Sequence, residues 1–253
     1  MDNYRQELID KILNNEIKEL GHNDTFKFSC NVCGKCCRNR DDIILNTFDI
    51  YRLAKFLSLT PYEFIEKYCD KYLGPDSKLP IVAMKFKTIY DLNKTYTACP
   101  FLKHRDGVLK CIVHEAKPTV CALFPLGRAI KIQDSELEVY YYEQDVCCGS
   151  KETTHTIKEW LDSYSISDSE EAFILFSDFT KKLYEIIDLR KLHDEKIISE
   201  KMMESFYFML VNLMYLKYDT NKPFIEQYKE NLNSICKMSS NIAEILRLNS
   251  TKA

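Results

Sequence analysis

The stretch Phe28-Ser29-Cys30-Asn31-Val32-Cys33-Gly34-Lys35-Cys36-Cys37 decides how this chain is read. It has the spacing C-x2-C-x2-C-C, with a glycine in its tightest turn. Free cysteine packs like a small hydrophobic residue, and packing gives no reason for such clustering. Closely spaced thiolates do suit a soft metal ion or an iron–sulfur cluster. The stretch therefore predicts a metal centre.

The composition is that of an ordinary globular protein. The chain has 253 residues, a formal net charge of -3 and 45% hydrophobic residues, which allows one large domain or two small ones. The near-neutral charge argues against a nucleic-acid partner bound through a basic face. No apolar run approaches the roughly 20 residues that span a bilayer, and residues 1–20 lack the apolar stretch of a secretory signal. We therefore expect a cytoplasmic protein with no nucleic-acid and no membrane partner.

The cytoplasmic expectation determines how the 11 cysteines are interpreted. Disulfides are rare in a reducing compartment, where metal binding or catalysis is the more common use of cysteine. The odd number would also leave one thiol over in a complete disulfide framework. Both points favour a metal-binding role.

Helical and extended patterns divide the chain into two parts. Apolar residues at helical spacing predict helices over 4–20, 48–57 and 61–68. Thr47 is the predicted N-cap of the second helix, and Thr60-Pro61-Tyr62-Glu63 is a capping box that opens the third. Cys69 is expected to lie on a helix after Tyr68 and to be buried in the core. Residues 81–89 read as a strand, and turns at Arg105-Asp106-Gly107 and Asp134-Ser135 predict two β-hairpins. After His155 the pattern is helical, over 156–164, 167–189, 197–217 and 223–247. Ser167-Asp168-Ser169-Glu170 is a predicted capping box at the start of the second of these helices.

These elements predict an α+β fold that is predominantly helical. We expect an N-terminal helix over 1–21, a cysteine-cluster metal-binding region over 22–150 and a helical region over 151–253. In this prediction the cysteine-rich region is stapled by metal, contains short β-hairpins and packs on a C-terminal helical bundle. Because its strands and loops hold little apolar surface, metal binding should be coupled to folding of residues 22–150.

Further cysteines lie in recognisable segments. These are Cys99-Pro100-Phe101-Leu102, Cys111 through Cys121-Ala122-Leu123-Phe124-Pro125-Leu126-Gly127-Arg128, and Cys147-Cys148-Gly149. Together with the first run, their order and spacing resemble the YkgJ-like CxxCxxCC cysteine-cluster family, described as zinc- or iron-chelating. The resemblance covers about 26–162 and implies eight metal-ligand candidates: Cys30, Cys33, Cys36, Cys37, Cys99, Cys111, Cys121 and Cys147.

The chain departs from the family pattern at two places, and it has one extra thiol. Lys117 stands where the family usually has arginine, which keeps the charge but loses the bidentate fork. His114 stands where the family often has tyrosine, and it creates a Cys-x2-His pair that could bind zinc. Cys148 lies beside Cys147, so the sequence leaves open which of these two thiols is a ligand.

Spacing alone does not choose the metal. Eight thiolates would satisfy two four-ligand centres or one larger cluster, and adjacent residues such as Cys36 and Cys37 are expected to point apart toward different irons or sites. Four cysteines around zinc would form a closed structural site. The C-x2-C-x2-C spacing is also ferredoxin-like, although the fourth ferredoxin cysteine is missing from this run. We favour an iron–sulfur cluster of the 4Fe-4S type, with zinc as the alternative.

The leading functional hypothesis is a metal-binding cysteine-cluster protein with an electron-transfer or redox role. One alternative is a zinc-stapled scaffold that binds a protein partner through its C-terminal helices. Another is a protein-modifying enzyme related to the flagellin lysine N-methylases, which carry a related cysteine cluster. The chain has no radical-SAM C-x3-C-x2-C motif, no dinucleotide fingerprint and no P-loop, and so the sequence names no catalytic residue.

Overall fold

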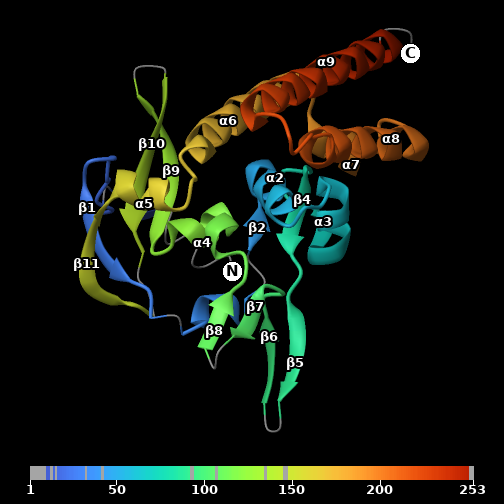
Figure 1. Ribbon diagram of the computed structural model, residues 1–253. Coiled ribbons are helices and arrows are strands. Elements are labelled where there is room, and N and C mark those ends of the chain that lie inside the picture. The colour runs from blue at the N-terminus through green and yellow to red at the C-terminus, as the bar shows by residue number, and fades with distance from the viewer. Residues whose placement is uncertain are drawn as a thin grey trace.

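The computed structural model describes residues 10–11, 14, 16–31, 33–40, 43–91, 94–105, 108–133, 136–144 and 148–250. Short strands alternate with a few helices up to Thr156, and helices follow from there to the C-terminal end (Figure 1). This arrangement confirms the predicted α+β class.

The strands pair locally in small antiparallel sheets. The two-stranded sheets are β1 (Thr25–Ser29) with β11 (Ser150–Thr156), β9 (Leu126–Gln133) with β10 (Glu136–Glu143), β5 (Lys87–Asp91) with β6 (Lys94–Ala98), and β7 (Leu102–Arg105) with β8 (Val108–Cys111). A three-stranded sheet has the order β2 (Ile44–Leu45), β4 (Pro80–Met84), β3 (Cys69–Leu73). The strand pairs of both predicted hairpins are confirmed, as β7–β8 and β9–β10, while the predicted turn residues 106–107 and 134–135 lie outside the described residues.

Two capped helices follow the first cysteine run. Helix α2 (Thr47–Phe56) begins after Asn46, whose side chain accepts a hydrogen bond from the Asp49 amide at 2.8 Å. Helix α3 (Pro61–Tyr68) has the capping box expected from Thr60 and Glu63, with proline at its first position. The predicted N-cap of α2, Thr47, is wrong by one residue because Asn46 offers a better acceptor for the helix N-terminus.

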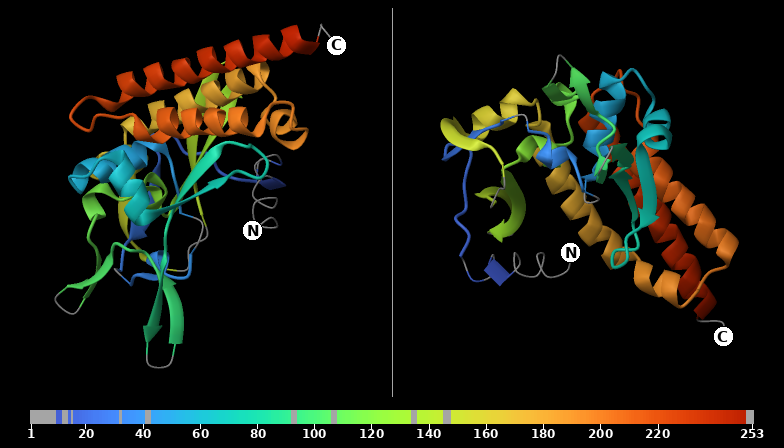
Figure 2. Two further views of the ribbon diagram at one scale, coloured as in Figure 1. Left: turned by 90° about the vertical axis from the view of Figure 1, so that its right-hand side faces the viewer. Right: turned by 90° about the horizontal axis from the view of Figure 1, so that it is seen from below.

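The second half of the chain is a helical layer. Its helices are α5 (Ile157–Ser163), α6 (Asp168–Ile186), α7 (Leu189–Asp194), α8 (Glu200–Val211), the π-helical turn η3 (Asn212–Leu216) and α9 (Phe224–Ser250). Helix α9 lies along α6, and together with α7 and α8 they cover one side of the molecule, opposite the β5–β6 hairpin (Figure 2). The capping box predicted at Ser167 does not form, because the Ser167 hydroxyl donates to Asp162 Oδ1 at 2.8 Å.

Three other predictions need correction. Most of the helix predicted over 4–20 lies outside the described residues, and residues 16–20 are not helical. Leu20 instead forms an antiparallel bridge with Tyr141 through backbone hydrogen bonds of 2.8 and 3.0 Å. The strand predicted over 81–89 is divided between β4 and β5. Cys69 is buried as expected, but it begins β3 and is not on a helix.

One hydrophobic core joins the two halves of the chain. It contains Phe26 and Phe101 from the cysteine-rich part as well as Leu183 and Phe224 from the helices. The cysteine-rich part therefore holds more apolar surface than its sequence suggested, and metal-coupled ordering is now expected in the loop 30–40 and in the hairpins next to it. Among the described residues, no helix is both long and apolar enough to cross a bilayer.

Candidate metal centre

The first cysteine run turns sharply at Gly34. The backbone there has φ 67°, in the left-handed region that glycine adopts without strain. The short helix η1 (Lys35–Cys37) follows, and the Cys37 amide donates to the Gly34 carbonyl at 3.1 Å. A Cβ atom at Gly34 would lie 3.4 Å from Leu109 and 3.6 Å from Leu102. The turn thus seats the cysteine loop directly on the β7–β8 hairpin.

Backbone pairing brings Cys99 and Cys111 to this loop. The Cys99 amide donates to the Cys37 carbonyl at 2.9 Å, and the Leu102 amide donates to the Cys99 carbonyl at 3.0 Å. In the hairpin, Leu102 is directly opposite Cys111. Cys37 and Cys99, which are 62 positions apart in the chain, are therefore joined by backbone hydrogen bonds that local sequence does not predict.

Cys121 is presented by the short helix α4 (Thr119–Leu123), which is anchored from two sides. The buried Asp49 carboxylate accepts hydrogen bonds from the Thr119 amide at 2.7 Å and the Thr119 hydroxyl at 2.6 Å. The indole nitrogen of Trp160 donates to the Ala122 carbonyl at 2.9 Å. Sequence reasoning missed both anchors, because nothing in the spacing of Asp49 or Trp160 indicates which loop each one contacts.

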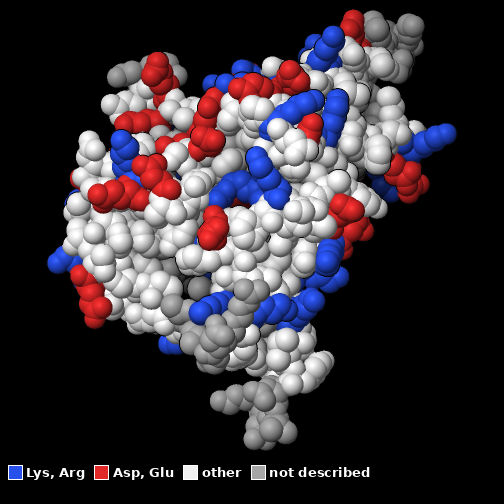
Figure 3. Space-filling model, viewed as in Figure 1, with Lys and Arg blue, Asp and Glu red and all other residues white. Residues whose placement is uncertain are grey.

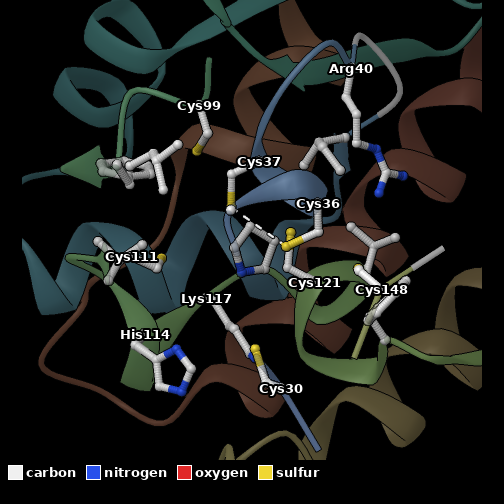
Figure 4. A pocket seen from close by; sticks show the side chains of 18 of the residues that line it. Cys30, Cys36, Cys37, Arg40, Cys99, Cys111, His114, Lys117, Cys121 and Cys148 are labelled. Carbon is white, nitrogen blue, oxygen red and sulfur yellow. Dashed lines mark hydrogen bonds between the residues drawn. The ribbon is translucent and has the colours of Figure 1, made fainter. Parts of the chain in front are cut away.

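These segments enclose one cavity of about 140 Å³, which we call the cysteine pocket. Figure 4 shows cysteines that enter it from the first loop, from both hairpin-flanking segments and from α4. Seven of the eight predicted ligands line the pocket: Cys30, Cys33, Cys36, Cys37, Cys99, Cys111 and Cys121. The eighth, Cys147, lies outside the described residues, and its neighbour Cys148 lines the pocket. The fold thus gathers residues that are more than a hundred positions apart.

Cys36 and Cys37 do not point apart, contrary to the expectation for adjacent residues. Their Sγ atoms are 3.7 Å apart (Figure 4). The η1 turn rotates both side chains toward the same space. Two thiolates bound to one zinc ion at about 2.3 Å in tetrahedral geometry would be separated by about 3.8 Å. The pair therefore has the spacing of two ligands on a single metal atom.

The thiols of the pocket differ in their pKa values. A hydrogen bond from Cys37, together with the cations Lys117 and Arg40, lowers the pKa of Cys36 to about 6. Burial raises the pKa of Cys99 to about 11 and raises the pKa of Cys111 and of Cys121 as well. Cys36 is thus the thiol that is readiest to act as a thiolate, and the buried side of the pocket stays protonated until a metal displaces the protons.

Two further polar residues line the pocket. The Lys117 ammonium lies 3.8 Å from the centre of the Tyr164 ring, which holds its charge beside the thiols. The His114 ring meets Tyr164 edge-on at 5.7 Å, and burial and the Lys117 charge lower the His114 pKa. A neutral imidazole can bind a metal, so a ligand role for His114 remains a prediction.

The donor set fits a thiolate-bound centre. Eight cysteines surround the pocket, and much of the remaining wall is apolar, with Phe28, Phe101 and Trp160 among its residues. Among the residues described, no group of three or more His, Cys, Asp or Glu side chains is arranged to hold one metal ion. The sulfurs therefore face a shared space with room for several water molecules, and they do not converge on one point.

Metal retention should depend on pH in a defined direction. Metal binding to Cys99, Cys111 or Cys121 must release protons, because burial raises their pKa values and keeps them protonated near neutrality. Each released proton strengthens binding about tenfold per pH unit. Lowering the pH from 8 to 6 should therefore accelerate metal loss to a chelator, as followed by elemental analysis after desalting. Equal retention across this range would contradict the assignment of these thiols.

Comparison with known proteins agrees with the site. Residues 29–148 match the family model named CxxCxxCC, whose description reads "Putative zinc- or iron-chelating domain". No solved structure matches the chain. The matched segment begins one residue before Cys30 and ends at Cys148, so it contains every cysteine of the pocket. Through residues 29–148 the chain therefore matches the CxxCxxCC family.

Proposed function

We propose that the cysteine pocket holds an iron–sulfur cluster of the 4Fe-4S type and that the protein transfers electrons through it. The observation that carries this proposal is the shape of the site. Eight cysteines line one cavity of about 140 Å³. A single ion in contact with four sulfurs needs no such cavity, whereas a cluster must be accommodated between its ligands.

The two sides of the pocket suit different tasks in holding a cluster. Cys30, Cys33 and Cys36 are exposed and have the ferredoxin-like C-x2-C-x2-C spacing. Cys99, Cys111 and Cys121 are partly buried on the other segments, and one of them would supply the fourth ligand from the inner side. An iron–sulfur cluster supplies one-electron redox chemistry when bound. The exposed cysteines would bring one side of it close to the surface, where a redox partner can approach.

The other residues of the pocket would control water and charge. Phe28, Phe101 and Phe124 keep solvent from the inner wall. Lys117 and Arg40 offset the negative charge of the thiolates and lower the pKa of Cys36. Burial, charge and solvent exposure are the features by which a protein sets the potential of a thiolate-bound centre.

Anaerobic purification tests the proposal directly. The protein is expected to be brown, to contain iron and acid-labile sulfide in equal amounts, and to give an electron-paramagnetic-resonance signal after reduction with dithionite. A colourless protein with stoichiometric zinc and no sulfide would overturn the cluster.

Zinc is the second candidate, and one observation favours it. The 3.7 Å separation of the Cys36 and Cys37 sulfurs matches two ligands on a single tetrahedral ion. In a four-iron cluster each iron binds one cysteine, so only one member of this pair could be a ligand. With zinc, the centre would be a structural site that holds the first loop against the hairpins.

A further inference from the structure

Lys117 reaches the cysteine pocket from the segment that joins Cys111 to Cys121 (Figure 4). Its side chain is partly buried, and its ammonium lies 3.8 Å from the centre of the Tyr164 ring, which also lines the pocket. The electron-rich face of an aromatic ring attracts a cation and so holds the charge at a fixed place. The pocket therefore has a positive charge built into its wall.

Lys117 differs in its contacts from lysines elsewhere on the surface. On the helical layer and on the β9–β10 hairpin, lysines lie beside carboxylates, as in Lys229–Glu171 and Lys131–Glu19, each at 2.6 Å. Figure 3 shows blue and red side chains mixed over α6 and α9. In the part of the chain that the structure describes, no carboxylate forms a salt bridge with Lys117. Its charge is therefore left to act on the thiols of the pocket.

Arg52, on α2, fixes the backbone on both sides of the contact between Lys117 and Tyr164. Its guanidinium donates to the Tyr164 carbonyl at 2.6 Å and to the Lys117 carbonyl at 3.4 Å. It also donates to the Glu115 carbonyl at 3.1 Å. The planar guanidinium presents several N–H donors in a fixed arrangement. One side chain thus joins the two segments that carry the ring and the ammonium.

The electrostatic influence of Lys117 extends to thiols on different segments of the pocket. The hydrogen bond from Cys37 is the main cause that lowers the pKa of Cys36, and the Lys117 charge lowers it further. Burial raises the pKa of Cys111 and of Cys121, and the Lys117 charge opposes that rise. One cation thus favours the thiolate form in the first loop, at the end of β8 and on α4.

We infer that Lys117 sets the charge balance of the metal centre, and that Arg52 and Tyr164 are positioning residues that hold its ammonium at the pocket. Four thiolates carry more negative charge than a zinc ion or the core of a cluster neutralises, so a cation nearby stabilises the centre with either metal. The effect on a reduction potential rests on the proposed function, whereas the effect on metal retention holds for iron and for zinc.

Replacing Lys117 with methionine is expected to make the centre harder to reduce. One-electron reduction adds a negative charge to the pocket, and a nearby cation favours the reduced form. Loss of the cation should shift the reduction equilibrium about tenfold toward the oxidised form, which is about 59 mV for one electron. Lys117→Arg keeps the charge and can stack on the Tyr164 ring, so it should retain the parent potential. The measurement is a redox titration followed by visible absorbance.

Lys158→Met is the matched control for this experiment. Lys158 is exposed on α5, the helix that ends just before Tyr164, and it is not among the residues that line the pocket. The control makes the same change in net charge, so its potential should equal that of the parent. Equal shifts in Lys117→Met and Lys158→Met, or no shift in Lys117→Met, would overturn the role of Lys117.

Combined variants test the positioning role. Tyr164→Leu and Arg52→Met should each shift the potential in the same direction as Lys117→Met. Tyr164→Phe keeps the ring and Arg190→Met removes an arginine that donates to the Asp76 carbonyl at 2.7 Å away from the pocket, so neither should shift it. If the two residues act through the lysine, adding Lys117→Met to either variant should produce little further shift. Fully additive shifts would overturn the positioning role, and Tyr164→Leu alone decides it if Arg52→Met does not fold.

Metal retention separates a failure of this inference from a failure of the proposed function. The metal content of each variant is measured after incubation with a chelator. In a colourless zinc protein, zinc loss about tenfold faster from Lys117→Met than from Lys158→Met would contradict the cluster and leave the role of Lys117 intact. A brown protein in which Lys117→Met keeps both the potential and the metal would do the reverse. Equal zinc loss from a colourless protein would overturn both.

Discussion

Replacing Cys33 with serine is expected to weaken metal binding more than about a hundredfold, because a hydroxyl is a poor substitute for a thiolate ligand. Cys33 is exposed in the first loop, so loss of packing could not explain such a result. Cys121→Ser should have the same effect from the inner side of the pocket. The measurement is metal content per protein after dialysis against a chelator.

Limited proteolysis of the same variants should show where the metal orders the chain. New cleavage is expected in the loop 30–40 and in the β5–β6 and β7–β8 hairpins, while the helical layer should stay protected by the continuous core. Cys236→Ser, on α9 and outside the pocket, is the matched control and should keep its metal. If both Cys33→Ser and Cys121→Ser retain full metal content, the ligand assignment is wrong.

Trp160→Ala is expected to lower the free energy of unfolding by about 3–5 kcal/mol, the range for removing a buried aromatic side chain. Trp160 packs against Phe26 with ring centres 5.3 Å apart and against His155 at 4.9 Å. It also donates the hydrogen bond to the Ala122 carbonyl, next to Cys121. Metal retention should therefore fall together with stability.

Trp160→Phe separates the two contributions of this residue. It keeps an aromatic ring in the core but leaves the buried Ala122 carbonyl without its donor, which should cost about 1–3 kcal/mol. Urea unfolding followed by circular dichroism is the suitable measurement, because Trp160 is the single tryptophan of the chain and its fluorescence is lost in both variants. An unchanged unfolding midpoint in Trp160→Ala would show that the ring does not support the core.

The sequence predicted those features that arise from neighbouring residues. Capping residues around α3 and the turn residues of β7–β8 and β9–β10 lie next to the elements they define, so local chemistry was sufficient. The same local reasoning failed at Leu20, which forms a bridge with the distant Tyr141 instead of extending a helix. It failed again at Ser167, whose hydroxyl found a tertiary partner in Asp162.

By itself the sequence determined that this chain carries a thiol-rich metal site, since four cysteines in C-x2-C-x2-C-C spacing have little other use. Only the tertiary structure decided how that site is built. The Cys37–Cys99 hydrogen bond, the Asp49 and Trp160 anchors of α4 and the 3.7 Å approach of two adjacent sulfurs depend on contacts between distant segments.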